Sequence, residues 1–283
     1  KDFASIHQAD VMAILQAEEA SGKVADINAL WIVNAINCKA TLEVIYNLSS
    51  HPDVAKLSYN KEIQLLSEEQ MSETAGAQRG PAAHVVTSNA EDVWGQNYTG
   101  KNVVVAVLDT GTNIYHNDLK DHLWEGDVDG ETVNGWNVIA NNSNIVDDNG
   151  HGTHCAGIVC GDGTSGTTTG VAPDALLMTV KTLAATGTGS VDNMIAGVQF
   201  AVENGADILS MSLGYKSHQI SVAQKEMIRD AFDAVLTSGA IVCAAVGNDG
   251  NTYGAPYNVD YPAACPSPWR NPDQTLEGGL SSV

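Results

Sequence analysis

The stretch that decides the fold is VVVAVLDTG, residues 103–111. Its first six residues, Val103 to Leu108, form an unbroken apolar run, which is typical of a strand in a parallel sheet covered on both faces. Asp109 follows directly. Ligands bind at the carboxyl ends of strands in such sheets, and an acid placed there can orient a histidine and stabilise its charged form. Taken alone, an Asp at a strand end is more typical of a turn residue that accepts local backbone N–H groups.

Strands and helices alternate along the chain beyond this segment. The expected strands are residues 176–180, 208–211 and 241–245. The expected helices begin at His151, Ser190 and Ser221, and the last two end at Gly205 and Gly239. Strand–helix–strand units with short connections predict an α/β fold, in which a parallel sheet carries helices on both faces.

Residues 1–66 follow a different pattern, which predicts a small α+β domain. Helices are expected over 10–20 and from Thr41 onward, a strand over 30–36 (LWIVNAI), and polar–apolar alternation over 54–59. The following stretch, SEEQMSETAGAQRGP, is polar and rich in small residues and is interpreted as a linker. The expected division is therefore a domain at 1–66, a linker at 67–90 and an α/β domain at 91–283.

The composition excludes several classes of function. Hydrophobic residues make up 43% of the 283 residues and charged residues 17%, which is the balance of a globular protein. The 13 basic and 34 acidic residues give a net charge of −21, which repels phosphate backbones and argues against nucleic-acid binding. An apolar run of about 18 residues, the length needed to span a membrane, does not occur.

Two more strand ends carry side chains suited to catalysis. In DDNGHGTHCAG, residues 147–157, small neighbours leave His151 exposed at a helix start, where an imidazole can approach its partners. In AAVGNDG, residues 244–250, the amide of Asn248 can donate a hydrogen bond into a cleft, which is the chemistry that stabilises an oxyanion. The backbone of SMSLG, residues 210–214, could pair with an extended peptide. Structural histidines and ordinary turns are the alternatives.

Together these motifs resemble those of the subtilisin-like serine proteases, or subtilases. VAVLDTG, GHGTHCAG, VAP at residues 171–173, GADILSMSLG and AAVGNDG match the family in order and approximate spacing. The order Asp, then His, then Ser is the one that subtilisins use. The resemblance covers most of residues 85–265 and implies a serine-type endopeptidase with a subtilisin-like fold and a polypeptide substrate.

The resemblance also assigns roles to individual residues. Asp109 becomes the acid of a catalytic triad, His151 the general base and Asn248 the oxyanion-hole donor. The residues expected to bind substrate are Ser212, Leu213, Gly214 and Asp249. The first three would line the non-prime side, and the carboxylate of Asp249 could favour Lys or Arg at the rim of the first specificity pocket.

Residues 1–66 are similar to the inhibitory propeptide of the family, a ferredoxin-like α+β domain. This implies a zymogen in which the propeptide blocks the cleft until the linker at 67–90 is cut. The family also implies a secreted monomer, although no signal peptide precedes Lys1.

One part of the family pattern is missing from the 283 residues. The nucleophilic serine of subtilases lies in a GTSMA-type segment that opens a later helix, and the sequence contains no such segment. Ser281 and Ser282 lack both the preceding Gly-Thr and a following helix. We therefore expect the chain to be truncated before the nucleophile, with an incomplete sheet and no activity alone. The alternative is a catalytically dead pseudoprotease or a self-inhibited binding module.

No cofactor is expected to take part in catalysis, and no metal ligand is assigned. Asp118 matches a structural calcium ligand of the family, but the partner loop GDGTSGTTTG, residues 161–170, lacks the usual ligand positions, so a structural calcium ion is left open.

A zinc hydrolase is a competing interpretation. It would use His151 and His154, whose spacing of three residues differs from the usual four. Cys155 is expected to be a small buried packing residue. The five cysteines are odd in number, and Cys155 and Cys160 should not pair with each other.

Overall fold

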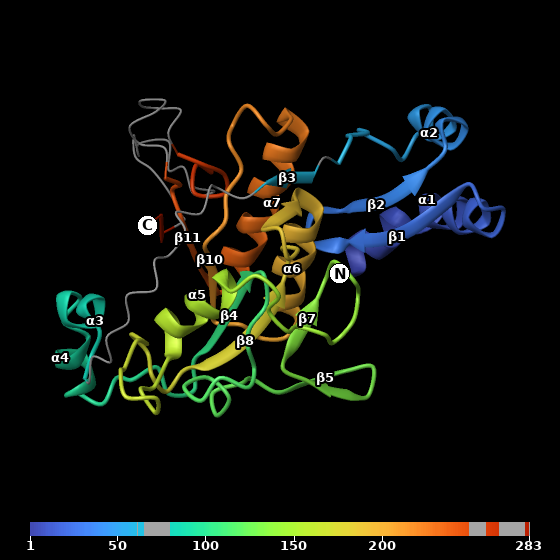
Figure 1. Ribbon diagram of the computed structural model, residues 1–283. Coiled ribbons are helices and arrows are strands. Elements are labelled where there is room, and N and C mark those ends of the chain that lie inside the picture. Colours follow the sequence, from blue (N-terminus) through green and yellow to red (C-terminus); the bar gives the residue numbers. More distant parts are fainter. Residues whose placement is uncertain (61, 65–79, 249–258, 266–280, 283) are drawn as a thin grey trace.

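The structure is a computed structural model that describes residues 1–60, 62–64, 80–248, 259–265 and 281–282. Its centre is a six-stranded, fully parallel sheet in the order β12-β11-β10-β4-β8-β7 (Figure 1). The strands are β4 (Val104–Asp109), β7 (Gly135–Asn137), β8 (Leu176–Lys181), β10 (Ile208–Met211), β11 (Ile241–Ala244) and β12 (Ser281–Ser282). The predicted parallel α/β sheet is thus confirmed, with the decisive strand β4 inside it.

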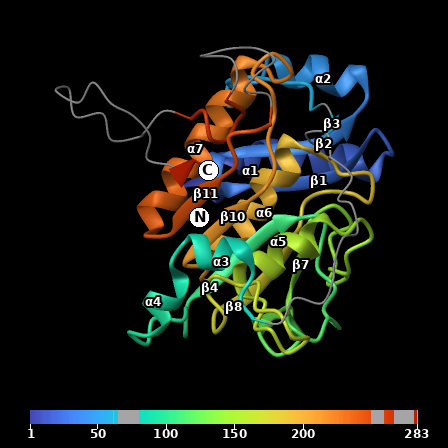
Figure 2. The same ribbon diagram turned by 60° about the vertical axis from the view of Figure 1, so that its left-hand side comes forward.

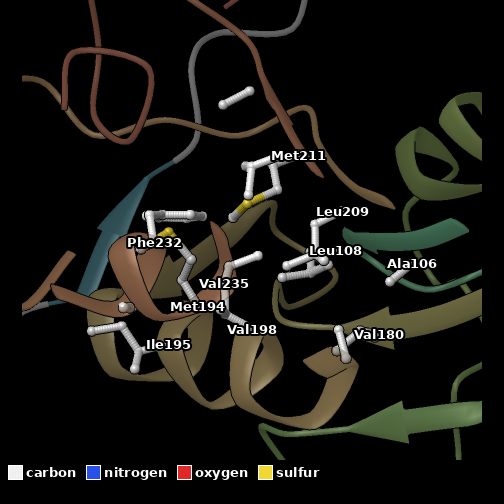
Figure 3. Packing of buried hydrophobic residues seen from close by; sticks show 14 of the residues in the cluster. Ala106, Leu108, Val180, Met194, Ile195, Val198, Leu209, Met211, Phe232 and Val235 are labelled. Carbon is white, nitrogen blue, oxygen red and sulfur yellow. The ribbon is translucent and has the colours of Figure 1, made fainter. Parts of the chain in front are cut away.

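Helices cover both faces of the sheet. Successive side chains of β4 point to opposite faces, so they pack alternately in the two cores that these helices form with the sheet. Val105 and Val107 pack in a cluster with α5 (His151–Cys160). Ala106 and Leu108 pack on the other face with α6 (Val191–Glu203) and α7 (Val222–Ser238), as Figure 3 shows. The α7 helix begins and ends at the predicted residues. Ser221 and Gln224 form a capping box, and Gly239 adopts the left-handed conformation that stops the helix.

Smaller elements extend this core. They are the hairpin of β5 (Gly126–Val128) and β6 (Glu131–Val133) and the short helices α3 (Ala83–Thr87) and α4 (Ala90–Trp94). The segment before α3 pairs with the loop after α5, since the Ala82 N–H donates to the Thr168 carbonyl at 2.9 Å. Among the described helices, none is long and apolar enough to cross a membrane.

The N-terminal residues form an α+β unit with a small core of its own. Its elements are α1 (Asp2–Ala20), β1 (Val24–Leu30), the 3-10 helix η1 (Trp31–Val33), β2 (Ala35–Ala40) and α2 (Leu42–Ser49). The strands β1 and β2 pair antiparallel, and side chains of α1, β1 and α2 pack together in one cluster. Residues 54–60 contain no strand.

The prediction of one strand over 30–36 is wrong. The apolar run LWIV is divided between the end of β1 and η1, and Asn34 then turns the chain in the left-handed conformation. The apolar side chains of this run serve tertiary packing and not the formation of one strand. Leu30 and Ile32 are buried in the same cluster as the side chains of α6 and α7, so the turn between β1 and β2 packs on those helices.

The N-terminal unit therefore lies against α6 and α7, which both views show (Figures 1 and 2). Trp31 Nε1 donates to Glu203, and Lys56 pairs with Glu226. Further along, β3 (Glu62–Gln64) pairs antiparallel with β9 (Thr188–Ser190) just before α6. An extended segment that follows the N-terminal unit is thus held on the α/β domain by backbone hydrogen bonds.

Candidate active site

The predicted acid and base meet at the carboxyl end of β4. The side chain of Asp109 is 1% exposed, and its Oδ1 lies 2.8 Å from Nδ1 of His151. The same Oδ1 accepts the Thr110 N–H at 2.7 Å. The backbone carbonyl of Asp109 accepts two N–H groups from the segment after β8. Both the backbone and the carboxylate of the acid are therefore fixed by hydrogen bonds.

Two glycines allow the imidazole to reach this carboxylate. Gly150, the residue before α5, has φ of +111°, a conformation that residues with a Cβ rarely adopt. Gly152 packs on the backbone of the strand end, where a Cβ would lie 2.2 Å from the Gly111 carbonyl oxygen. The small residues around His151 thus bring the start of α5 into contact with the end of β4, as the sequence motif indicated.

The carboxylate changes the protonation of His151. The hydrogen bond to Asp109 raises the pKa of His151, the nearby Cys155 thiol adds to this effect, and burial opposes it. For His154, three residues later, the pKa is shifted in the opposite direction. Burial and the positive charges of His151 and His84 lower the pKa of His154. The pKa values of the two imidazoles of one helix are therefore displaced in opposite directions.

Proton NMR of this chain should resolve that difference directly. On raising the pH, we expect the ring protons of His154 to titrate below the ordinary histidine pKa of about 6.5 and those of His151 to titrate above it. A titration of His151 at or below the position of His154 would contradict the Asp109 contact.

The same shift has a consequence for stability. The folded-state pKa of His151 is raised, so its contribution to folding is fully present below the unfolded pKa of about 6.5 and is lost as the pH rises through the folded value. The free energy of unfolding should therefore fall on the alkaline side in the native chain, and less so in a His151→Gln variant. Urea titrations over a series of pH values measure both slopes.

The remaining predicted site residues lie at neighbouring strand ends. Asn248 follows β11, and its side chain is exposed at the same edge of the sheet as Asp109. Ser212 is half-buried directly after β10, whereas Leu213 is 1% exposed and belongs to the core, so only its backbone can face a substrate. Gly214 is buried. Asp249 lies outside the described residues.

Cys155 also belongs to this site. It is buried, as expected, and its Sγ lies 3.9 Å from Nδ1 of His151. Among the described residues, the one group of three potential metal ligands with mutually close atoms is Asp109, His151 and Cys155. His154 is exposed and is not part of it, so the pair of histidines that a zinc hydrolase would need does not converge.

The carboxylates around Asp118 do not by themselves specify a calcium site. Asp118 is buried, and its Oδ1 accepts the Ser165 N–H at 2.5 Å. The other nearby acid, Asp162, binds Thr164 and lies 3.2 Å from Nε2 of His122. Calcium needs about six to eight oxygen ligands, and two carboxylates that also have protein partners do not supply that number.

The strand β9 was not predicted from the sequence. Its residues, TGS, show no apolar alternation, and only the pairing with β3 reveals them as a strand. The loop before β9 contacts the loop before α5, since Asn149 Nδ2 donates to the Ala185 carbonyl at 2.9 Å. The strand that pairs with β3 thus begins three residues after Ala185, whose carbonyl contacts the loop that precedes His151.

A buried acid that orients an imidazole, at the carboxyl edge of a parallel α/β sheet, is the arrangement in which hydrolases of the Ser-His-Asp type hold their acid and base. Comparison with known proteins places this pair in a family. The sequence profile described as Peptidase_S8, the subtilase family, matches residues 100–271. The chain belongs to the subtilase family, whose members are serine endopeptidases.

Individual relatives agree with this assignment. Subtilisin DY of Bacillus licheniformis is 37% identical over 62% of this chain and 57% of its own length. The major intracellular serine protease of Bacillus subtilis (strain 168) is 38% identical over 62% of this chain and 52% of its own length. The minor extracellular protease Epr of the same bacterium is 34% identical over 62% of this chain and 24% of its own length. The chain spans about half the length of the first two relatives.

Proposed function

We propose that the complete protein is a serine endopeptidase made as a zymogen, and that this chain supplies its acid and its base. The observation that carries the proposal is the 2.8 Å contact between Asp109 and His151 within a subtilase domain. The nucleophilic serine would come from residues outside these 283, because the sequence holds no GTSMA-type segment. The substrate is a polypeptide.

The proposed mechanism uses each residue at a stated atom. His151 Nε2 takes the proton of the serine hydroxyl as the oxygen attacks the peptide carbonyl, and later returns it to the leaving amine. Asp109 holds the proton on Nδ1 and stabilises the charged imidazole. The Asn248 amide donates to the oxyanion, and the backbone of residues 212–214 binds the extended substrate. No cofactor takes part.

The zymogen part of the proposal rests on where the N-terminal unit lies. Residues 62–64 pair with β9 as an extended peptide would, beside the loop that contacts Asn149. A substrate and this segment would compete for the same edge. Residues 1–64 therefore act as an intramolecular inhibitor. A cut in the linker at 67–90 breaks the covalent connection between this inhibitor and the α/β domain.

One buried carboxylate joins the two parts. Asp192, in the first turn of α6, is 7% exposed and accepts the amide Nδ2 of both Asn37 and Asn60. Asn37 lies on β2, and Asn60 lies two residues before β3. A hydrogen bond to a charged acceptor contributes about 1.5–3 kcal/mol, so each amide should matter for holding the inhibitor in place.

Asn37→Ala should loosen this contact. We expect residues 1–60 to be cut at least about tenfold faster by an added protease, because proteolysis follows the population of the open form. Asn47→Ala, on the exposed face of α2, is the matched control. Equal cleavage rates in the two variants would show that Asp192 does not hold the inhibitor.

The complete gene product tests the function itself. Purified after processing, it should hydrolyse unstructured peptides, lose activity to a serine-directed phosphonate, and keep it in a chelator. A label on a residue other than serine, or no hydrolysis after the inhibitor has been removed, would contradict the proposal.

We further propose that the complete protein is a secreted monomer. The relatives include one named extracellular and one named intracellular, so export needs its own test, which is activity in cell-free medium.

A further inference from the structure

Thr110 lies between the acid and the helix that carries the base. It follows Asp109 directly and is fully buried. Its hydroxyl donates to Asp147 Oδ1 at 2.9 Å and accepts the N–H of Gly152, the residue after His151, at 2.9 Å. Its carbonyl accepts from the buried ammonium of Lys181. A single residue is thus bound to the acid, to the start of α5 and to the loop between them.

Asp147 is the second part of this arrangement. Its carboxylate accepts the N–H groups of Asn149, Gly150 and Thr153 and the hydroxyls of Thr110 and Thr153. Burial acts to raise the pKa of Asp147, but these hydrogen bonds, led by the Gly150 N–H, outweigh it and keep the pKa below its usual range. A carboxylate at the N-terminal end of a helix is also favoured by the helix dipole.

We propose that Thr110 is a positioning residue for the Asp109–His151 pair, with its hydroxyl fixed by Asp147. The Thr110 hydroxyl connects the end of β4 to α5, so it sets how the imidazole of His151 faces Asp109. Neither Thr110 nor Asp147 has to touch a substrate for this role. The inference rests on the proposed peptidase function for its activity measurement, but its structural measurement needs no nucleophile.

Two substitutions separate the hydroxyl from the packing of Thr110. Thr110→Val keeps the shape and removes the hydroxyl, which leaves the Gly152 N–H without a partner and takes away one of the three donors to Asp147 Oδ1. Thr110→Ser keeps the hydroxyl and removes a methyl group. Loss of positioning predicts a defect in the Val variant and rescue by Ser, whereas a packing role predicts the reverse.

The first measurement is proton NMR of this 283-residue chain. A proton shared between Nδ1 of His151 and the buried Asp109 carboxylate resonates at low field. We expect this resonance to be lost or shifted upfield in Thr110→Val and retained in Thr110→Ser. Thr179→Val is the matched control, because Thr179 is also fully buried and its hydroxyl donates to the hydroxyl of Thr112, not to Thr110 or Asp147. The control should keep the resonance.

The second measurement is peptide hydrolysis by the complete protein. Misplacing a catalytic group by about 1 Å can cost about a hundredfold in rate, so kcat of Thr110→Val should fall about ten- to a hundredfold with KM unchanged. An unchanged resonance and unchanged kcat in Thr110→Val, or equal losses in Thr110→Ser, would overturn the inference. If Thr110→Val does not fold, Asp147→Asn replaces it and must show the same loss of the resonance. A native resonance without any hydrolysis would refute the peptidase proposal and leave the inference intact.

Discussion

Replacing His151 with Ala in the complete protein should abolish both self-cleavage and peptide hydrolysis. His151 is the one described imidazole in contact with Asp109, so no neighbouring side chain can take over the proton transfer. The expected loss in kcat is about a millionfold, a magnitude that comes from a subtilisin, a member of the same family.

His154→Ala is the matched control for this experiment. It changes the other histidine of α5, which is exposed and has no part in the proposed chemistry. The control should keep most of the activity. If the His151→Ala protein still cleaved its own linker, the assignment of the base would be wrong.

The second large effect is expected from Asp109→Asn. The amide is the same size as the carboxylate, but its NH₂ group would face Nδ1 of His151 and donate to it. Nδ1 then has to be the unprotonated nitrogen, so the proton lies on Nε2, which can no longer accept one from a nucleophile. We expect kcat to fall about ten-thousandfold, an effect known for the same exchange in a serine protease of another fold.

NMR of the 283-residue chain gives this variant an independent measurement. Asp109 is the main cause of the raised pKa of His151, so the ring protons should titrate nearer the ordinary histidine value in Asp109→Asn. Asp230→Asn, on α7 at the other face of the sheet, should leave the titration of His151 in place. If Asp109→Asn did not move that titration, the pair would not be coupled as proposed.

The sheet and the contact between Asp109 and His151 could be predicted from the sequence because both depend on local patterns. The run Val103–Leu108 is long and apolar, and the glycines around His151 mark a backbone that must come close to another. The carboxyl ends of parallel strands share one edge, so Asp109 and His151 could be expected to meet.

The features that could not be predicted depend on contacts between residues that are far apart in the sequence. The run LWIV looks like a strand because it is apolar, but its burial comes from contacts with α6 and α7, more than 150 residues away in sequence. The β9 strand has no local signal, since its partner β3 supplies the hydrogen bonds. The link from Thr110 to Asp147 joins polar residues 37 positions apart, and no periodicity indicates such a contact.

The alternation of side chains along β4 has a practical consequence for making this protein tolerate heat. Substitutions at 106 or 108 that fit the existing core would change contacts with α6 and α7, which carry neither Asp109 nor His151. Changes at 105 or 107 would instead press on α5 and tilt the base. A search for hardier variants should therefore draw its core substitutions from the first pair of positions and leave the second pair as it is.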